Sequence, residues 1–441
     1  MTEAAIEHYL GEFSRLEPVQ LDWLRKVRDS AIEKFRSTGF PTTRVEDWKY
    51  TDIRPIVAKN FVPTVAGRDI PSQEEIQRLG FSNMDCYELV YVNGSYSADL
   101  SSISGLEGIT VSSISEALRS DNSAIKTCFE KFNEKDRNAF DSLNSAFLTD
   151  GSYIYVPDNS QIDKPIHLLF IGRQAGESAA CHIRNLIILG NNSRATVIES
   201  YTGINVEEYL TNTISDITIG TGARLDHYKL QRESINGYHI GSIRAALKKD
   251  SSLESHSISL GGALVRNNIN ADLEEPGAEI IMNGLYIAGG KQHVDNHTCV
   301  HHRVANTRSE ENYRGVLDGK ARGVFNGKVV VHEQAQKTDA SQSNANLLLS
   351  NDAEVDTKPE LEIYADDVKC SHGATVGQLD QDMLFYLQSR AIDKTAARSL
   401  LTFAFAEEII KRIKFAPIRE RLEQSVVGKL PDTDLIRGFM K

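Results

Sequence analysis

The spacing of apolar and polar residues changes twice along the chain and divides it into three zones. In the first zone apolar residues recur at helical spacing, at Leu24, Val27, Ala31 and Phe35. Gly39 follows this stripe and is a typical helix-ending residue. The pattern predicts a helical N-terminal domain over residues 1–84.

The second zone, residues 85–384, begins with strand-like sequence, and from about residue 153 onward it carries apolar runs of three to five residues separated by Asn-Gly, Asp-Gly and Gly-Gly pairs. This pattern is typical of many short strands joined by tight turns. We expect one β core domain, interrupted by a helical segment at about 115–148. Because Asn-Gly and Asp-Gly accept a positive φ cheaply, the predicted turns include Asn283-Gly284, Asp318-Gly319 and Asn326-Gly327. The pattern indicates a β-sandwich or a β-solenoid and leaves both open.

The third zone, residues 385–441, returns to helical spacing. Its apolar stripe consists of Leu401, Phe405, Ile409 and Ile413. Residues 386–441 hold 11 Lys and Arg against 7 Asp and Glu, so this tail carries +4 while the rest of the chain carries −16. A basic helical surface on an acidic protein favours docking of a partner, although a solvated face on a helix packed against the β domain gives the same pattern.

Charge and cysteine usage exclude several classes of protein. The net charge of −12 comes without a basic stripe, which speaks against nucleic-acid binding. The first residues lack the basic and apolar regions of a secretory signal, and no apolar run approaches the roughly 20 residues that span a bilayer. Five widely spaced cysteines without a Cys-x-x-Cys pair argue against a disulfide framework or a zinc ribbon. We expect a cytoplasmic protein with reduced thiols and no membrane contact.

The candidate chemistry lies at Cys370 and His372, two residues apart in a β-prone stretch. Residues i and i+2 of a strand share a face, so the thiol and the imidazole should point the same way, and both are ligands for iron or zinc. Two ligands do not complete a metal site, and the others would come from elsewhere in the fold or from a second chain. Val368 shares this face and free cysteines are often buried, so the spacing taken alone favours a core role.

Three segments around this pair carry a family resemblance: Gly-Val-Phe-Asn-Gly-Lys-Val-Val-Val at 323–331, Ala-Gln-Lys-Thr-Asp-Ala-Ser-Gln-Ser-Asn at 335–344 and Leu-Phe-Tyr-Leu-Gln-Ser-Arg at 384–390. A weaker match lies at 41–51, and together the matches cover nearly the whole chain. They resemble the SufD branch of the SufB/SufD family of iron-sulfur cluster assembly proteins. SufB relatives carry a Cys-Gly-Ala-His-type segment where this chain reads Asn351-Asp-Ala-Glu-Val-Asp-Thr-Lys358, so this chain alone should not accept sulfur.

The resemblance implies a mainly β fold, with a right-handed parallel β-helix flanked by N-terminal and C-terminal helical domains. It implies a non-catalytic scaffold subunit of the Suf complex that pairs with SufB through the β-helix and binds the SufC ATPase through residues 385–441. The expected SufC contacts are Leu401, Phe405, Ile409, Arg412 and Ile413. Alone, such a chain could also form a homodimer.

The resemblance also implies a role for the candidate pair. His372, with Cys370 beside it, would be a ligand or near-ligand for iron or a transient iron-sulfur cluster at the SufB interface, and would contribute to cluster formation and iron acquisition. Reduced flavin is associated with complexes of this family, although the sequence shows no dinucleotide-binding fingerprint.

Further motifs bear on two alternatives to a scaffold, a metalloenzyme and a polysaccharide-acting enzyme, and on a possible ATP site. His297, Cys299 and His301 would share a strand face and could form the metal site of a metalloenzyme, together with His293 and His302 nearby, although polar ladders of a β-helix give the same spacing. Two Gly-x-x-x-Gly-Lys segments lack the fourth spacer residue and the Ser or Thr of a phosphate loop, so no ATP site is expected. A polysaccharide-acting β-helix enzyme would need paired carboxylates and usually a secretion signal.

Overall fold

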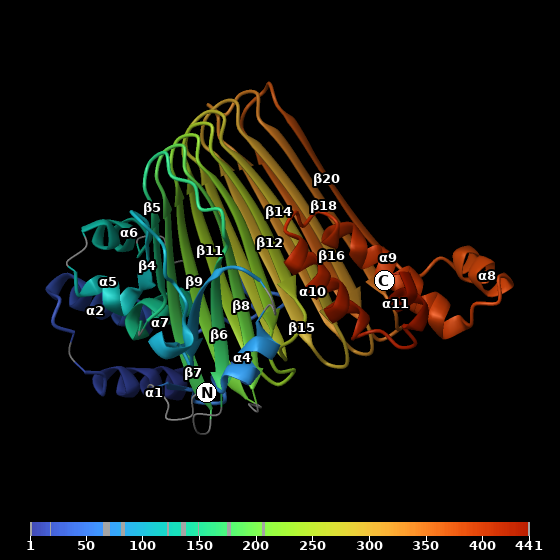
Figure 1. Cartoon of the computed structure of the whole chain (residues 1–441), viewed down its shortest axis with the longest axis horizontal. Helices are drawn as coiled ribbons and strands as arrows, with labels where there is room; N and C mark the ends of the chain where they lie inside the picture. The colour runs from blue at the N-terminus through green and yellow to red at the C-terminus, as the bar shows by residue number, and fades with distance from the viewer. Residues whose placement is uncertain are drawn as a thin grey trace.

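The body of the molecule is a parallel β-solenoid with helices packed around it (Figure 1). The computed structural model describes residues 2–17, 19–64, 71–80, 84–120, 123–133, 138–148, 150–173, 178–204 and 208–439. From β5 onward the chain alternates between two sheets, which we name A and B. The predicted parallel β-helix is therefore confirmed.

Sheet A contains the odd-numbered solenoid strands, in the spatial order β5 (Ser152–Val156), β7 (Ala179–Leu189), β9 (Tyr209–Ile219), β11 (Tyr238–Leu247), β13 (Leu264–Leu273), β15 (His293–His302), β17 (Arg322–Val331) and β19 (Glu354–Ile363). Sheet B contains β6 (Ile166–Arg173), β8 (Arg194–Ile204), β10 (Arg224–Arg232), β12 (Ser252–Ser259), β14 (Glu279–Ala288), β16 (Arg308–Leu317), β18 (Asp339–Leu348) and β20 (Lys369–Gly377). Both sheets begin with extra strands: β1 (Val62–Pro63) and β4 (Thr110–Ser113) in sheet A, β2 (Tyr87–Val92) and β3 (Ser95–Tyr96) in sheet B.

The strands of each sheet stack in register, so equivalent side chains form columns inside the solenoid. One inward column of sheet B consists of Ala195, Leu225, Leu253, Ile280, Ser309, Ala340 and Cys370. Its members are 27 to 31 residues apart in sequence, which is the length of one coil. The inward apolar side chains form the largest hydrophobic core of the molecule.

Two of the three predicted turns are wrong. Asn283-Gly284 lies inside β14 and Asn326-Gly327 inside β17, whereas Asp318-Gly319 does form the turn between β16 and β17, with a φ of 66° at Gly319. A Cβ on Gly284 would approach the Tyr313 ring of the next coil to 2.1 Å. These glycines therefore make room for an aromatic side chain inside the solenoid instead of bending the chain.

Helices of the N-terminal half cover sheet A. They are α1 (Thr2–Ser14), α2 (Asp22–Thr38), η1 (Glu46–Trp48), α3 (Arg54–Val57), α4 (Gln73–Leu79), η2 (Ala98–Leu100), α5 (Ile114–Leu118), α6 (Ser123–Asn133) and α7 (Ala139–Phe147), of which α4 and η2 lie on sheet B instead. The predicted helix at Leu24–Phe35 is α2, which ends at Gly39. Phe35 of α2 and Phe140 of α7 share one apolar core with Leu210 of β9, so these helices and the solenoid pack as one body.

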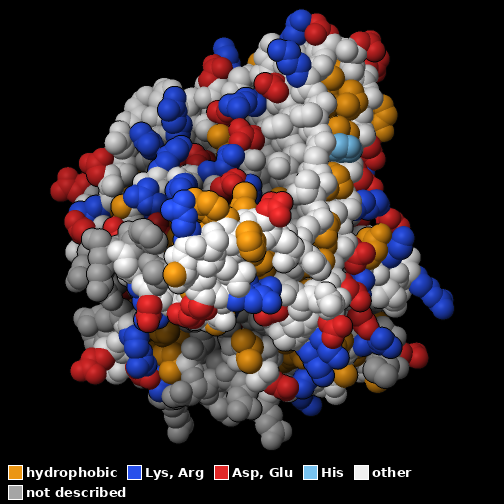
Figure 2. All heavy atoms as spheres, turned by 90° about the vertical axis from the view of Figure 1, so that its right-hand side faces the viewer, with side chains coloured by type: hydrophobic (Ala, Val, Ile, Leu, Met, Phe, Trp, Pro, Cys, Tyr) orange, Lys and Arg blue, Asp and Glu red, His pale blue; other side chains and the backbone are white. Residues whose placement is uncertain are grey.

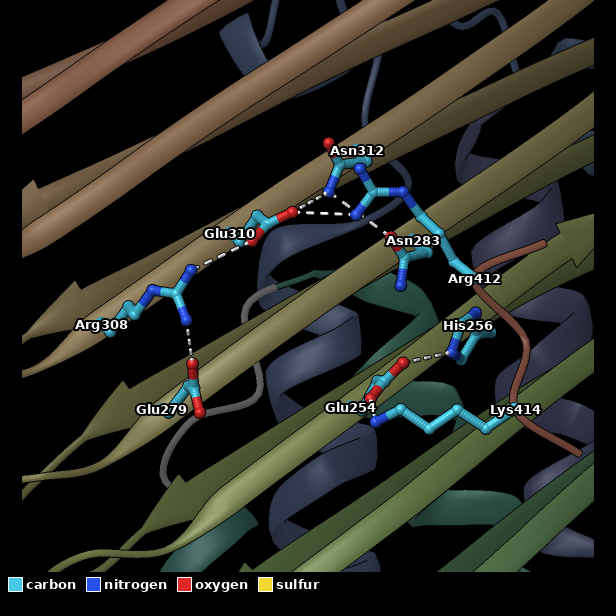
Figure 3. A network of polar contacts seen from close by, with 9 residues as sticks. All are labelled: Glu254, His256, Glu279, Asn283, Arg308, Glu310, Asn312, Arg412 and Lys414. Atoms are coloured by element: carbon cyan, nitrogen blue, oxygen red, sulfur yellow. Dashed lines mark hydrogen bonds and ion pairs between the residues drawn. The ribbon is translucent and has the colours of Figure 1, made fainter. Parts of the chain in front are cut away.

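Four helices of the C-terminal part follow the last strand: α8 (Gln381–Ser389), α9 (Lys394–Ile410), α10 (Ala416–Val427) and α11 (Asp434–Phe439). Ile409 and Ile418 pack against Ile258 and Leu285 on the outer face of sheet B. Polar contacts pin the segment after α9 to the same sheet (Figure 3): Arg412 donates to Glu310 at 2.9 Å, and Lys414 pairs with Glu254. Part of the basic charge of this tail is therefore used within the chain.

Candidate functional site

The predicted pair lies on β20, the last strand of the solenoid. Cys370 and His372 share the inward face, as their spacing predicts, and stack on Ala340 and Gln342 of β18. Cys370 is half-buried against the interior core, and burial raises the pKa of its thiol. His372 is exposed, because no further coil covers this position. The structure thus keeps the two side chains together and presents the imidazole at the open end.

The open end exposes backbone edges as well as side chains. In the described part of the chain β19 and β20 each pair on one side only, with β17 and β18 respectively. Val376 of β20 is 48% exposed and Ile363 of β19 is 42% exposed. Figure 2, which views the molecule from this end, shows apolar and histidine side chains at the surface between charged groups. An uncovered strand edge with apolar side chains is a typical site for pairing with another chain.

A buried polar column leads from His372 into the solenoid. Glu311, Gln342 and His372 occupy the same position on three successive coils. Thr298 donates to Glu311 Oε2 at 2.5 Å, and Gln342 Nε2 donates to Glu311 Oε1 at 3.1 Å. Despite these hydrogen bonds, burial raises the pKa of Glu311 to about 7. A carboxyl group with a pKa of about 7 therefore lies two coils below His372, with Gln342 between them.

Replacing Glu311 by glutamine is expected to stabilise the fold at neutral and alkaline pH. The folded-state pKa of about 7 exceeds the ordinary value of 4.5, so the unfolded chain loses the proton first and ionisation penalises folding as pH rises from 4.5 to 7. The gain should be absent near pH 4, should grow through this window and should reach about 3 kcal/mol above pH 7. Urea unfolding of both proteins at a series of pH values measures it.

The glutamine can keep both hydrogen bonds of Glu311. Gln342 Oε1 has no partner among the described residues, so a flipped Gln342 amide can accept from the new Nε2 group while Thr298 donates to the new oxygen. Glu310→Gln is the matched control, because this neighbour points outward, and its pKa is lowered by hydrogen bonds from Asn312 and then Arg412. The control should not stabilise, and equal gains from both variants would contradict the assignment.

The predicted partner stripe of the C-terminal zone is largely internal. Ile409 and Ile413 are fully buried between α9, α10 and sheet B. Phe405 is partly buried, with the Arg314 guanidinium 4.6 Å from its ring centroid, and Leu401 packs in a small core with α8. Arg412 is partly exposed but pairs with Glu310. A partner can reach Leu401, Phe405 and Arg412 only in part, and it cannot reach the two isoleucines without unfolding this region.

The accessible apolar surface of the C-terminal zone is instead on α8. Leu384 is buried in a core with Leu379 and Ala397, and this contact turns the other side of the short helix outward. Phe385 is 73% and Tyr386 57% exposed on that side, and α8 projects away from the solenoid (Figure 1). Sequence reasoning missed these residues, although adjacent apolar and aromatic residues that no single helical stripe can bury were the available signal.

The histidine-rich strand β15 does not bring together the three side chains that its spacing left open as a metal site. His297, Cys299 and His301 do share the outer face of sheet A, beside a cavity of about 670 Å³ under the N-terminal helices. However, His297 Nε2 turns to Asp295 at 3.0 Å, while His301 contacts Cys299 at 3.4 Å and His332 at 3.3 Å. Among the described residues these three side chains do not converge on one point. His293 bonds to Thr51 and His302 to Ser309, so both are occupied in the fold.

Membrane-spanning character is a property of long apolar helices. Among those described, none combines the length and the apolar composition that crossing a bilayer requires.

Two family models match this chain and together cover most of its length. The model described as "SUF system FeS cluster assembly, SufBD core domain" matches residues 170–405, and the model described as "SufBD protein N-terminal region" matches residues 2–168. An iron-sulfur cluster assembly SufBD family protein of Synechocystis is 32% identical over 408 residues, covering 90% of this chain and 89% of the relative.

Proteins named for iron-sulfur cluster assembly are similar over nearly their whole length. The iron-sulfur cluster assembly protein SufD of Escherichia coli is 32% identical over 402 residues, covering 91% of this chain and 92% of the relative. SufD of Bacillus subtilis is 26% identical over 445 residues, covering 96% and 98%.

Proposed function

Because the chain belongs to the SufBD family of iron-sulfur cluster assembly proteins, we propose that it is a scaffold subunit that joins a SufB-type chain at the open end of its solenoid. A SufD-type role in cluster assembly is what its relatives support. The observation that carries the finer proposal is the uncovered last coil, where Cys370 and His372 lie on a strand with a free edge.

The ligand count supports a site shared between two chains. Iron-sulfur clusters are usually held by four protein ligands, and the open end offers two candidates, Cys370 and His372. A partner solenoid that docks on the free edges of β19 and β20 would cover the exposed Ile363 and Val376 and could bring further ligands. A site divided between two chains can be assembled and opened by moving the chains. In this proposal iron acquisition belongs to the same shared site, and reduced flavin belongs to the assembled complex.

The sulfur acceptor would then be supplied by the partner. Residues 351–358, where SufB relatives carry cysteine, span the turn into β19 and contain no thiol. Cys370 is the one cysteine on the last coil, and burial followed by Asp339 raises the pKa of its thiol, which lowers its reactivity as a nucleophile. We therefore assign Cys370 a position beside the cluster instead of a role as acceptor.

We further propose that a SufC-type ATPase binds the exposed side of α8. Phe385, Tyr386 and Met383 form an apolar surface on a projecting helix that the chain itself leaves uncovered in its described part. Aromatic side chains are the commonest energetic anchors of protein interfaces. Removal of the whole tail from residue 395 would be a poor test of SufC binding. It would uncover Ile258, Leu285 and other apolar residues of sheet B that α9 and α10 cover, and so would disturb the fold as well.

The double variant Phe385→Ala, Tyr386→Ala is expected to weaken SufC binding by about 2 kcal/mol or more, which is roughly 30-fold. Both side chains are largely exposed, so the fold should be unaffected. Isothermal calorimetry of the purified chain with SufC from the same organism measures the change. Ile235→Ala is the matched control, because Ile235 is 63% exposed on a loop between β10 and β11. Equal SufC affinity of the double variant and the control would overturn this assignment.

Co-expression of the chain with SufB and SufC from the same organism tests the proposed function as a whole. The three proteins should elute together in size-exclusion chromatography, and the chain without SufB should show a homodimer through the same open end. Replacing Val376 by aspartate on the free edge should weaken assembly with SufB while leaving SufC binding intact. A chain that ignores SufB, or a Val376→Asp variant that assembles normally, would refute the proposed interface.

A further inference from the structure

A second group of metal-ligating side chains lies at the other end of sheet B. Cys86 directly precedes β2, Glu88 lies on β2 and His167 lies on β6, the first strands of this sheet, whereas β20 is the last. One ligand atom from each of the three lies within 4.8 Å of the other two. In the part of the chain that the structure describes, this is the one set of three His, Cys, Asp or Glu side chains that meets this limit.

The strand register builds this group. Cys86 and Glu88 are two residues apart and so lie on one side of the chain as it enters β2. Glu88 and His167 are direct partners in the parallel pair β2 and β6. Glu88 and His167 are therefore held by two hydrogen-bonded strands on the outer face of sheet B, and Cys86 lies one residue before the first of them.

A hydrogen bond to Ser200 holds the imidazole of His167 on the side away from Cys86 and Glu88. His167 is fully buried, and its Nε2 contacts Ser200 Oγ on β8 at 2.9 Å, while its Nδ1 lies 2.8 Å from Glu88 Oε1. With Nε2 held by Ser200, Nδ1 is the nitrogen that faces Glu88, and a metal ion would take the place of the proton in that contact. Metal-ligating histidines almost always hold their other nitrogen by a hydrogen bond of this kind.

The group remains reachable from solvent, and its carboxylate has no Lys or Arg partner among the described residues. The Glu88 side chain is 23% exposed, and Cys86 is half-buried. Gly80, just after α4, covers the group closely, since a Cβ there would come to 3.4 Å from Glu88 Oε1. Lys164 pairs with Asp85 at 2.7 Å, whereas Glu88 has no Lys or Arg partner within the described ranges. A cation can thus enter beside Glu88.

A purely structural role explains the group less well. A purely structural hydrogen-bond cluster would account for Glu88 and His167. It would not account for a thiol placed beside both.

We propose that Cys86, Glu88 and His167 form a binding site for a divalent first-row transition metal of the Zn²⁺ or Fe²⁺ class. The thiolate sulfur, a carboxylate oxygen and the Nδ1 nitrogen are the donors, a mixture that these cations accept. Three protein ligands leave one position of a tetrahedral site open to water or to an exchanging ligand, unlike a closed structural zinc site. The site is separate from the proposed SufB interface and stands or falls without it.

Titration of Co²⁺ into the purified, tag-free full chain tests the proposal. One equivalent of Co²⁺ should give a thiolate-to-Co²⁺ charge-transfer absorption band, and Zn²⁺ should abolish it by competition. Cys86→Ser and Cys86→Ala should each lose the band, with circular dichroism confirming that they fold. Ser200→Ala, which only removes the group behind the ring, should weaken Co²⁺ binding about tenfold.

Control variants separate this site from the other cysteines. Cys299→Ser and Cys370→Ser should retain the full band, because neither thiol lies in the group. Loss of the band in either control but not in the Cys86 variants would place the metal elsewhere and overturn the proposal. Absence of any thiolate band in the wild-type chain would overturn it equally.

Discussion

Replacing His372 by alanine is expected to reduce iron-sulfur cluster formation about tenfold or more while the chain still folds and assembles. The exposed imidazole makes no hydrogen bond or ion pair to the described residues, so its removal should cost the fold less than about 0.5 kcal/mol. A group that helps to hold iron typically matters tenfold to a hundredfold. The rate at which iron-sulfur enzymes mature in a strain wholly dependent on this pathway measures the effect.

Three further variants show whether the effect is specific to His372. Cys370→Ser should be milder than His372→Ala, because the half-buried thiol flanks the site in our assignment. His297→Ala and Cys299→Ala should do little, since both lie on the outer face of sheet A and not at the open end. Normal enzyme maturation with His372→Ala would remove the claim that this chain contributes a cluster ligand. The family assignment would be unaffected.

Local spacing predicted the zones of the chain but could not choose between a sandwich and a solenoid. The 3.6-residue stripe of α2 was legible because only one face of that helix is buried. The period of the solenoid could not be recognised in the sequence, because successive coils take between 27 and 31 residues. A repeat of varying length, with strands buried on both faces, leaves no fixed offset for sequence comparison within one chain.

The two wrongly predicted turns, like the unrecognised solenoid period, depend on contacts between residues one coil apart. Gly284 faces Tyr313 and Gly315 faces Tyr286, so glycine and tyrosine alternate along the inside of neighbouring coils. Which glycine bends the chain and which makes room for a ring depends on the residue one coil away. Asp318-Gly319 was predicted correctly because its φ is positive and the atoms nearest to Gly319 are the backbone atoms of Gly290, not a ring.

The candidate sites could be predicted where they depend on local spacing and could not where they depend on contacts between distant residues. The shared face of Cys370 and His372 needed only the two-residue period of a strand. The group of Cys86, Glu88 and His167 needed the register of β2 with β6, which joins residues 79 positions apart. The buried stripe of α9 was assigned to a partner because sequence cannot tell a face that packs within the chain from one that packs on another protein.

The largest loss of stability is expected from Asp216→Ala, on the outer face of sheet A. Asp216 is fully buried and accepts hydrogen bonds from two buried arginines, Arg184 at 2.7 Å and Arg244 at 2.6 Å. The same guanidinium groups donate to Ser145 Oγ of α7 and to the Phe132 carbonyl of α6, each at 2.9 Å. One carboxylate therefore compensates two buried cations and holds two helices on the solenoid.

Removing that carboxylate leaves both guanidinium charges buried, which should lower the free energy of unfolding by about 3 to 5 kcal/mol. Urea unfolding followed by circular dichroism measures the loss, and limited proteolysis should show earlier cleavage around α6 and α7. Asp356→Ala is the matched control, since Asp356 pairs with Arg322 at 2.8 Å on the partly exposed strand β19, where an ion pair contributes about 0 to 1 kcal/mol. If both variants lost less than about 1 kcal/mol, the two arginines would have to find other compensation, and Asp216 would not be the anchor of the helices on sheet A.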